Sequence, residues 1–120
     1  MRIAGDEYED RAARLLQNEG LTLLARNFRA RPGEIDIIAR EGNQLVFIEV
    51  RSRGNSRFES AAGSVDSRKR RRIIRAAQFY LQRQPQFAGL ACRFDVVAFE
   101  PPQSGVEREV RWIRAAFTAE

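Results

Sequence analysis

Apolar residues recur at helical spacing in two stretches of the 120-residue chain and form runs of strand length elsewhere. The helical pattern covers residues 6–19 and 67–84. The strand pattern covers residues 21–28, both arms of a hairpin over 33–53, and residues 93–100 and 106–113. The predicted order is therefore helix, three strands, helix, two strands, without an internal repeat or a second domain.

Residues 33–53 have the pattern of a β-hairpin, because two runs rich in Ile and Val flank a Glu-Gly-Asn turn signal. Each run carries one carboxylate among its apolar residues, Asp36 in the first and Glu49 in the second. A two-residue turn at positions 42–43 sets the register of the two strands. Counting back from that turn predicts that Asp36 lies directly opposite Glu49.

The alternation of side chains along a strand predicts one acidic and one apolar face for this hairpin. The two carboxylates share their face with Glu34 and Arg51. Ile38 and Phe47 lie on it too, so we expect that face to be partly covered. The opposite face is predicted to hold the remaining branched apolar residues, which are Ile35, Ile37, Val46, Ile48 and Val50.

Two carboxylates on neighbouring strands repel each other, and burying them without a partner is costly. A divalent cation would compensate, since Mg²⁺ prefers one or two carboxylates together with waters and substrate phosphates. Arg51 would then add positive charge where a scissile phosphate gathers negative charge. The alternative is a structural cluster of ion pairs between these acids and nearby arginines. The spacing alone is compatible with both interpretations.

Composition narrows the chemistry that is open to the chain. Its 43% hydrophobic and 31% charged residues fit one soluble globular domain over residues 1–120. The absence of histidine and the lone Cys92 exclude Ser-His-Asp and Cys-His catalysis and histidine-ligated zinc. No apolar run has membrane-spanning length, and the N-terminus lacks a signal-peptide stretch. We therefore expect a cytoplasmic protein that has no membrane partner.

The net charge of +5 and the isoelectric point near 10.6 suggest a polyanionic partner. Basic residues gather at the start of the second predicted helix, where cations oppose the helix dipole. That placement makes sense if this end of the helix faces phosphate; the alternative is a solvated basic face. We interpret this basic run and Arg53 as nucleic-acid-binding. The run consists of Arg68, Lys69, Arg70, Arg71 and Arg72.

Three other features have two interpretations each. Glu9 shares helical spacing with inward-facing residues, yet Asp6 and Glu9 also have the spacing of a capping box, which the residues alone favour. Asp95 is either a third acidic ligand or the partner of an arginine at the start of its strand, and we favour the partner role. The polar connection over 54–67 is either a functional loop or a plain linker.

Motifs in the same order over nearly the whole chain resemble a known family. They are Gly5-x3-Glu9-x2-Ala12, Asn27, Gly33-Glu34-Ile35-Asp36, Phe47-Ile48-Glu49-Val50-Arg51-Ser52-Arg53, Lys69, Arg93-Phe94-Asp95 and Ala116-Phe117. They resemble the YraN family of small bacterial proteins, which is similar to the PD-(D/E)XK nucleases and, among these, to Holliday-junction resolvases. The resemblance implies an α/β restriction-endonuclease-like core, with a mixed sheet flanked by helices in the order α-β-β-β-α-β-β.

The resemblance also implies an activity and a set of site residues. Asp36 and Glu49 match the metal-binding acids, and Glu9 matches the acidic residue of the first helix. The implied cofactor is Mg²⁺ or Mn²⁺, and the implied reaction is hydrolysis of phosphodiester bonds in structured or branched DNA, in which a basic residue orients the attacking water. The junction-cutting relatives imply a homodimer.

The chain departs from the superfamily signature at one catalytic position. Arg51 stands where the signature has its catalytic lysine. Arginine remains charged and can grip phosphate, but it is a poor proton carrier and its planar fork differs from an ammonium group. The departure is compatible with retained charge stabilisation or with a non-catalytic nucleic-acid-binding module that keeps the fold. Lys69, at the start of the second helix, is a candidate for supplying the missing amine.

Overall fold

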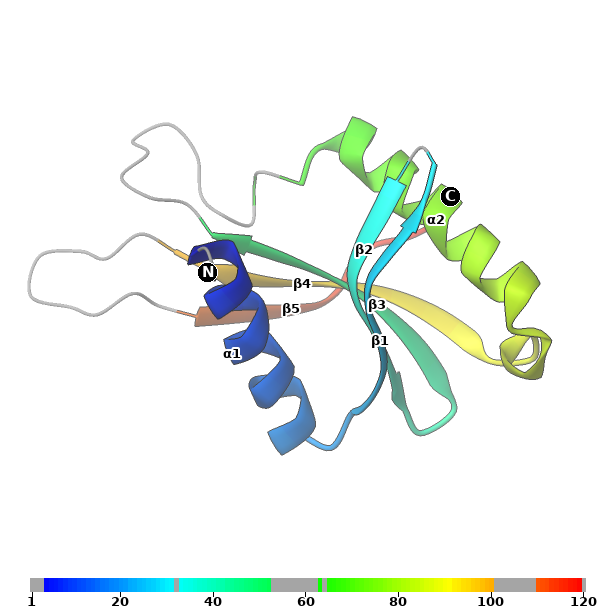
Figure 1. The fold of residues 1–120 in the computed structure, drawn as a ribbon, viewed down its shortest axis with the longest axis horizontal. Coiled ribbons are helices and arrows are strands. Elements are labelled where there is room, and N and C mark those ends of the chain that lie inside the picture. Colours follow the sequence, from blue (N-terminus) through cyan, green and yellow to red (C-terminus); the bar gives the residue numbers. More distant parts are fainter. Residues whose placement is uncertain (1–3, 32, 53–62, 64, 101–109, 120) are drawn as a thin grey trace, which may run out of the picture.

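The computed structural model describes residues 4–31, 33–52, 63, 65–100 and 110–119, and the structural statements below refer to these residues. They form a five-stranded sheet with a helix on each face (Figure 1). The elements are α1 (Ala4–Asn18), β1 (Thr22–Ala30), β2 (Gly33–Glu41), β3 (Gln44–Ser52), α2 (Ser67–Arg83), the short 3-10 helix η2 (Pro85–Phe87), β4 (Ala91–Phe99) and β5 (Val110–Phe117). This confirms the predicted order of helices and strands.

The sheet is mixed, with its strands in the order β1-β2-β3-β4-β5. The first three strands form an antiparallel meander. The connection containing α2 then carries the chain to β4, which lies parallel to β3, and β5 is antiparallel to β4. A mixed sheet with one helix on each face is compatible with the predicted restriction-endonuclease-like core. The last strand covers residues 110–117, later than the predicted 106–113, of which 106–109 lie outside the described residues.

Each helix buries its apolar stripe against one face of the sheet, as helical periodicity requires. Ala12 and Leu16 of α1 pack on one face, in a cluster that includes Val46 and Val97. The small side chain of Ala12 allows the backbone of α1 to approach the sheet. The apolar residues of α2 pack on the other face, among them Ile73, Ala76, Ala77 and Tyr80. The central strands are consequently covered on both sides.

The central hairpin has the predicted turn. Gly42 adopts a φ of +58°, which suits glycine in a two-residue hairpin turn. Glu41 pairs with Gln44, and the antiparallel pairing continues as far as Ile37 with Ile48. The predicted register of the hairpin is confirmed over this length.

The predicted position of Ile35 was wrong. Strand alternation predicted that it shares the face of Ile37, but Ile35 is buried with Ile38 and Phe47 on the α2 side of the sheet, whereas Ile37 lies on the α1 side. The simple period of two therefore breaks at Asp36, the residue between Ile35 and Ile37.

The pairing of β2 with both of its neighbouring strands, β1 and β3, is irregular next to Asp36. In β1, Asn27 lies between the residues paired with Ile35 and Ile37 and has a left-handed φ of +54°. The pairing of β2 with β3 stops at Ile37, one position before Asp36 and Glu49 would meet. Beyond that point the Val50 N–H donates to Asp36 Oδ2 at 2.8 Å. A side-chain hydrogen bond thus replaces the strand ladder where the two carboxylates lie.

No helix in the described ranges is long and apolar enough to cross a membrane.

Candidate functional site

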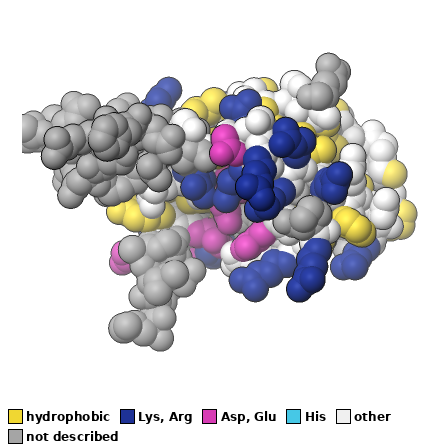
Figure 2. Space-filling model, turned by 90° about the horizontal axis from the view of Figure 1, so that it is seen from above, with side chains coloured by type: hydrophobic (Ala, Val, Ile, Leu, Met, Phe, Trp, Pro, Cys, Tyr) yellow, Lys and Arg dark blue, Asp and Glu magenta, His cyan; other side chains and the backbone are white. Residues whose placement is uncertain are grey.

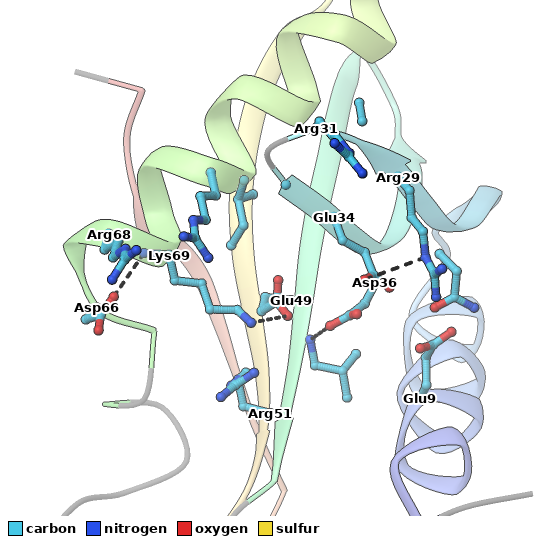
Figure 3. A pocket seen from close by; sticks show the side chains of 16 residues that line it. Glu9, Arg29, Arg31, Glu34, Asp36, Glu49, Arg51, Asp66, Arg68 and Lys69 are labelled. Carbon is cyan, nitrogen blue, oxygen red and sulfur yellow. Dashed lines mark hydrogen bonds and ion pairs between the residues drawn. The ribbon is translucent and has the colours of Figure 1, made fainter.

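An open cleft of about 920 Å³ lies between the β1–β2 end of the sheet and the first turns of α2 (Figure 3). Acidic side chains occupy its centre and basic side chains approach it from both sides, as Figures 2 and 3 show. The charged residues that line it are Glu9, Arg29, Arg31, Glu34, Asp36, Glu49, Arg51, Asp66, Arg68, Lys69 and Arg72. The cleft therefore offers sites for a cation and for anions side by side.

Glu49 is the most unusual of these groups. It comes from the middle of the sheet, is only 5% exposed, and its Oε2 atom has no hydrogen-bond partner among the described residues. Its Oε1 atom lies 3.7 Å from Lys69 Nζ. Burial raises the pKa of Glu49 to about 9, and the nearby Asp36 carboxyl group adds to the rise, against the opposing charges of Lys69 and Arg51. At neutral pH the Glu49 carboxyl group therefore holds a proton unless more positive charge enters the cleft.

Asp36 lies beside Glu49 and is held by the backbone. Its Oδ2 atom accepts the Val50 N–H at 2.8 Å, which orients the carboxylate at the point where β2 and β3 separate. The hydrogen-bond geometry leaves Asp36 pointing into the cleft with Glu49 (Figure 3). The structure thus brings together the two acids that the hairpin register predicted as a pair.

The first turn of α2 is fixed over the cleft by two contacts. Asp66 is the N-cap, and its Oδ1 atom accepts the backbone N–H of Lys69 at 2.9 Å. Gly33, the first residue of β2, lies so close to α2 that a Cβ atom would overlap the carbonyl group of Arg72. This backbone contact sets the distance between the acids on the sheet and the Lys69 side chain on the helix.

Glu9 also lines the cleft, but it is already paired. It is buried on α1, and its Oε1 atom accepts a hydrogen bond of 3.0 Å from Arg26, which also pairs with Asp10. Burial raises the pKa of Glu9 more than the Arg26 hydrogen bond lowers it. The capping-box prediction was wrong, because α1 begins at Ala4 and Asp6 is therefore inside the helix.

The three predicted metal acids are not arranged as a ligand cluster. Within the described ranges, no group of three or more Asp, Glu or Cys side chains is placed to hold a metal ion. Asp36 and Glu49 lie together, whereas Glu9 lies on the α1 side of the same cleft and is engaged with Arg26. A metal site here would consequently centre on the Asp36–Glu49 pair.

That pair fits a hard divalent cation. Both side chains offer carboxylate oxygens, which Mg²⁺ and Mn²⁺ prefer. One oxygen, Glu49 Oε2, is buried and lacks a hydrogen-bond partner among the described residues, so a cation would satisfy it. The raised pKa of Glu49 means that such a cation would compete with a proton.

The predicted basic run divides between two surfaces. Arg68, Lys69 and Arg72 line the cleft, whereas Arg70 and Arg71 line a second groove on the other side of α2. Arg51 lies beside Glu49 at the cleft (Figure 3), and Arg53 lies outside the described residues.

Two cleft arginines were missed by the sequence analysis. Arg29 and Arg31 belong to the end of β1 and the turn that follows, and that turn brings them to the wall opposite α2. Arg29 lies 3.8 Å from Glu34 Oε2 and is otherwise exposed. The available signal was their position directly before the Pro32-Gly33 break, which the β1–β2 turn brings to the cleft.

Asp95 has a structural role, as favoured by its sequence position. It is fully buried, and its two oxygens accept hydrogen bonds from Arg93 at 2.9 and 3.0 Å. Trp112 Nε1 and the Ala115 N–H also donate to it, each at 2.9 Å. By accepting these four hydrogen bonds, Asp95 joins β4 to β5. It does not line the cleft.

A mixed sheet flanked by helices, with a carboxylate pair in a cleft that basic residues also line, is compatible with the restriction-endonuclease-like class of proteins. Comparison with known sequences gives the family: the chain belongs to the uncharacterised protein family UPF0102, whose model matches residues 8–99. This confirms the resemblance to the YraN family. The matched region contains the acidic pair and the basic start of α2.

Relatives from several bacteria match almost the full length. A UPF0102 protein of Dechloromonas aromatica is 48% identical over 116 residues, which are 97% of this chain and 89% of the relative. One from Janthinobacterium is 44% identical over 118 residues (98% and 89%), and one from Pseudomonas fluorescens is 43% identical over 114 residues (95% and 92%). These names give a family and no activity.

Proposed function

We propose that this protein is a metal-dependent endonuclease that hydrolyses phosphodiester bonds in structured or branched DNA. The observation that carries the proposal is Glu49, a buried carboxyl group beside Asp36 with one oxygen that has no hydrogen-bond partner among the described residues, in a cleft flanked by basic side chains. Such a group costs folding free energy as it stands, and a bound cation would offset that cost.

Asp36 and Glu49 would hold the cation. When bound, Mg²⁺ or Mn²⁺ would supply Lewis-acid stabilisation and would lower the pKa of a bound water. Asp36 contributes a carboxylate already oriented by the Val50 N–H. Glu49 contributes a carboxylate that is shielded from bulk water and that must first give up its proton.

The basic residues of the cleft would bind the DNA backbone and stabilise developing charge. Lys69 and Arg51 flank Glu49, so both can donate hydrogen bonds to oxygens of a phosphate beside the acids. Arg68 and Arg72 on one wall, with Arg31 on the other, would hold flanking phosphates. In this division the flanking arginines position the DNA backbone, and Lys69 supplies the ammonium group beside the acids.

We assign to Lys69 the role of the signature lysine, because Arg51 stands at the signature position and has no ammonium group. Its ammonium group lies 3.7 Å from Glu49 Oε1, although it comes from the helix rather than from the strand that carries the signature. If Lys69 performs the role of the signature lysine, Lys69→Ala removes most of the cleavage, and Arg51→Ala has the smaller effect. Unchanged cleavage in Lys69→Ala would remove this role.

The direct test is cleavage of a labelled four-way junction with Mn²⁺ or Mg²⁺, read on a denaturing gel. We expect the wild type to cut and both Asp36→Asn and Glu49→Gln to lose cleavage. Glu19→Gln is the matched control, because Glu19 is an exposed acid outside the cleft. Cleavage that survives in Asp36→Asn, or an inactive wild type, would contradict the proposed reaction.

The second candidate is a nucleic-acid-binding module without catalysis. The position of Lys69 favours it, because its ammonium group lies 3.7 Å from Glu49 Oε1 and supplies positive charge beside the acidic pair without a metal ion. This module would bind DNA in a salt-dependent manner without binding Mg²⁺ or cutting. Junction binding by a wild type that neither binds a divalent cation nor cleaves would select this function over the first.

A further inference from the structure

A second groove, of about 760 Å³, lies on the side of α2 that faces away from the cleft. The C-terminal end of β5 forms its other wall, and Figure 1 shows this end of the chain beside α2. Its lining includes Arg70, Arg71, Ile74 and Arg75 of α2 and Phe117 of β5. Three arginines are its only charged lining residues among the described part of the chain.

The two hollows differ in charge because α2 turns about 100° per residue. The helix sends Arg68, Lys69 and Arg72 into the cleft, where five carboxylates also line the surface, and it sends its other N-terminal arginines into the groove. The groove is lined by no carboxylate of the described residues. It therefore suits an anion without a metal ion.

Arg70 builds the groove rather than offering a free charge. Its Nε atom donates to the Val65 carbonyl at 3.0 Å, and its guanidinium lies over the ring of Phe117, 5.4 Å from the centroid. These contacts join the start of α2 to the end of β5.

Arg71 and Arg75 are the exposed cations of the groove. Within the described ranges, neither forms an ion pair with a carboxylate. They are four residues apart on one helix face, a spacing at which like charges destabilise a helix. The first turn of α2 itself contains no acidic residue, and the carboxylate of the N-cap Asp66 is already bonded to the Lys69 N–H. An anion bound in the groove would offset the repulsion between the two arginines.

The two hollows lie on opposite sides of α2. A helix with its side chains is about 10–12 Å across. Successive phosphates of one strand rise only about 3.4 Å along the duplex axis. Arginines on opposite sides of α2 would therefore contact phosphates that are not neighbours on one strand.

We infer that the second groove, through Arg71 and Arg75, binds the phosphate backbone of a second DNA arm while a first arm occupies the cleft. The inference rests on the proposed function, because it takes DNA as the ligand of the cleft. It adds a specificity element: α2 lies between two arms, so branched DNA engages both sides of the helix and linear duplex DNA engages one.

The test compares the double variant Arg71→Gln/Arg75→Gln with the wild type. The matched control is Arg14→Gln/Arg83→Gln, which removes the same charge at exposed positions outside both hollows. Fluorescence anisotropy measures binding of a four-way junction and of a linear duplex with the sequence of one arm, without divalent ions, at several salt concentrations. Circular dichroism and sedimentation establish that fold and oligomeric state are unchanged.

For the groove variant we expect junction binding to weaken by roughly tenfold and its salt slope to fall by about one for each arginine, while duplex binding changes little. Hydroxyl-radical footprinting of the junction gives an independent readout: the wild type protects two separate stretches, and the groove variant loses one. The control variant should reproduce the wild type in both measurements.

Other outcomes separate this inference from the proposed function. A wild type that binds neither DNA overturns both. A groove variant that binds the junction like the control, or that loses junction and duplex binding equally, overturns the second arm and leaves the nuclease proposal standing. If the groove variant loses binding of a poly-glutamate peptide but keeps junction binding, the groove belongs to an acidic polypeptide and the inference is also overturned.

Discussion

Glu49 shows how a single residue joins fold and function. Strand β3 runs through the centre of the sheet, where the Glu49 carboxyl group is buried and loses most of its hydration. The chain supplies partial compensation through Lys69 at 3.7 Å, but Glu49 Oε2 finds no hydrogen-bond partner among the described residues. An apolar side chain at this position would be less costly to bury, and the cation that we propose here would offset the cost of the acid.

The raised pKa of Glu49 has a consequence for stability. In the folded chain the group stays protonated up to a pH of about 9, whereas in the unfolded chain it ionises near 4.5. Between these values the folded state binds more protons, so this group makes the free energy of unfolding fall as pH rises, by at most about 1.4 kcal/mol per pH unit. Below the unfolded pKa and above the folded pKa its contribution is constant.

We therefore expect Glu49→Gln to be more stable than the wild type at pH 8–9 and closer to it at pH 5, in metal-free buffer. Urea unfolding at several pH values measures the difference, and Glu19→Gln should follow the wild type throughout. A gap between Glu49→Gln and the wild type that is independent of pH would show that Glu49 is ionised in the folded protein.

At the scale of elements, the site depends on how α2 is docked. The acids belong to the sheet and Lys69 belongs to the helix, so their separation is set by the packing of α2 on the sheet. Gly33, at the start of β2, is a point of close packing, because its missing side chain admits the carbonyl group of Arg72. The same helix divides the basic residues between the cleft and the second groove.

Gly33→Ala should therefore disturb the site from a distance. The added methyl group overlaps backbone atoms, which cannot move as a flexible side chain would, so α2 must shift. We expect the free energy of unfolding to fall by about 1–3 kcal/mol. We also expect the positive charge of Lys69 to act less strongly on the Glu49 carboxyl group. Urea unfolding measures the first, and Gly89→Ala is the control because a Cβ atom there meets nothing within 4 Å. Equal stability of the two variants would contradict this role for Gly33.

For the molecule as a whole, the features set by local sequence were predictable and the non-local ones were not. The order of helices and strands and the hairpin register follow from period and turn chemistry, which act over a few residues. The break in alternation at Asp36 was missed, because it coincides with the left-handed Asn27 in a neighbouring strand. The ion pair of Glu9 with Arg26 was missed for the same reason, since α1 and β1 meet only in the folded chain.

The closeness of Asp36 and Glu49 was predictable from the sequence, but the protonation of Glu49 was not. Sequence register brings the two acids together, whereas the burial that raises the pKa of Glu49 exists only in the packed tertiary structure. The missed cleft residues Arg29 and Arg31 illustrate the same limit, because their wall exists only once β1 and β2 have paired.

The central claim is that Asp36 and Glu49 form a binding site for a divalent cation, and calorimetric titration with Mn²⁺ or Mg²⁺ tests it most directly. At pH 7 we expect the wild type to bind and to release a proton from Glu49, which appears as a dependence of the measured heat on the ionisation enthalpy of the buffer. Asp36→Asn should abolish binding, and Glu19→Gln should leave it unchanged. Absence of binding to the wild type, with or without DNA, or binding that persists in Asp36→Asn, would contradict the claim.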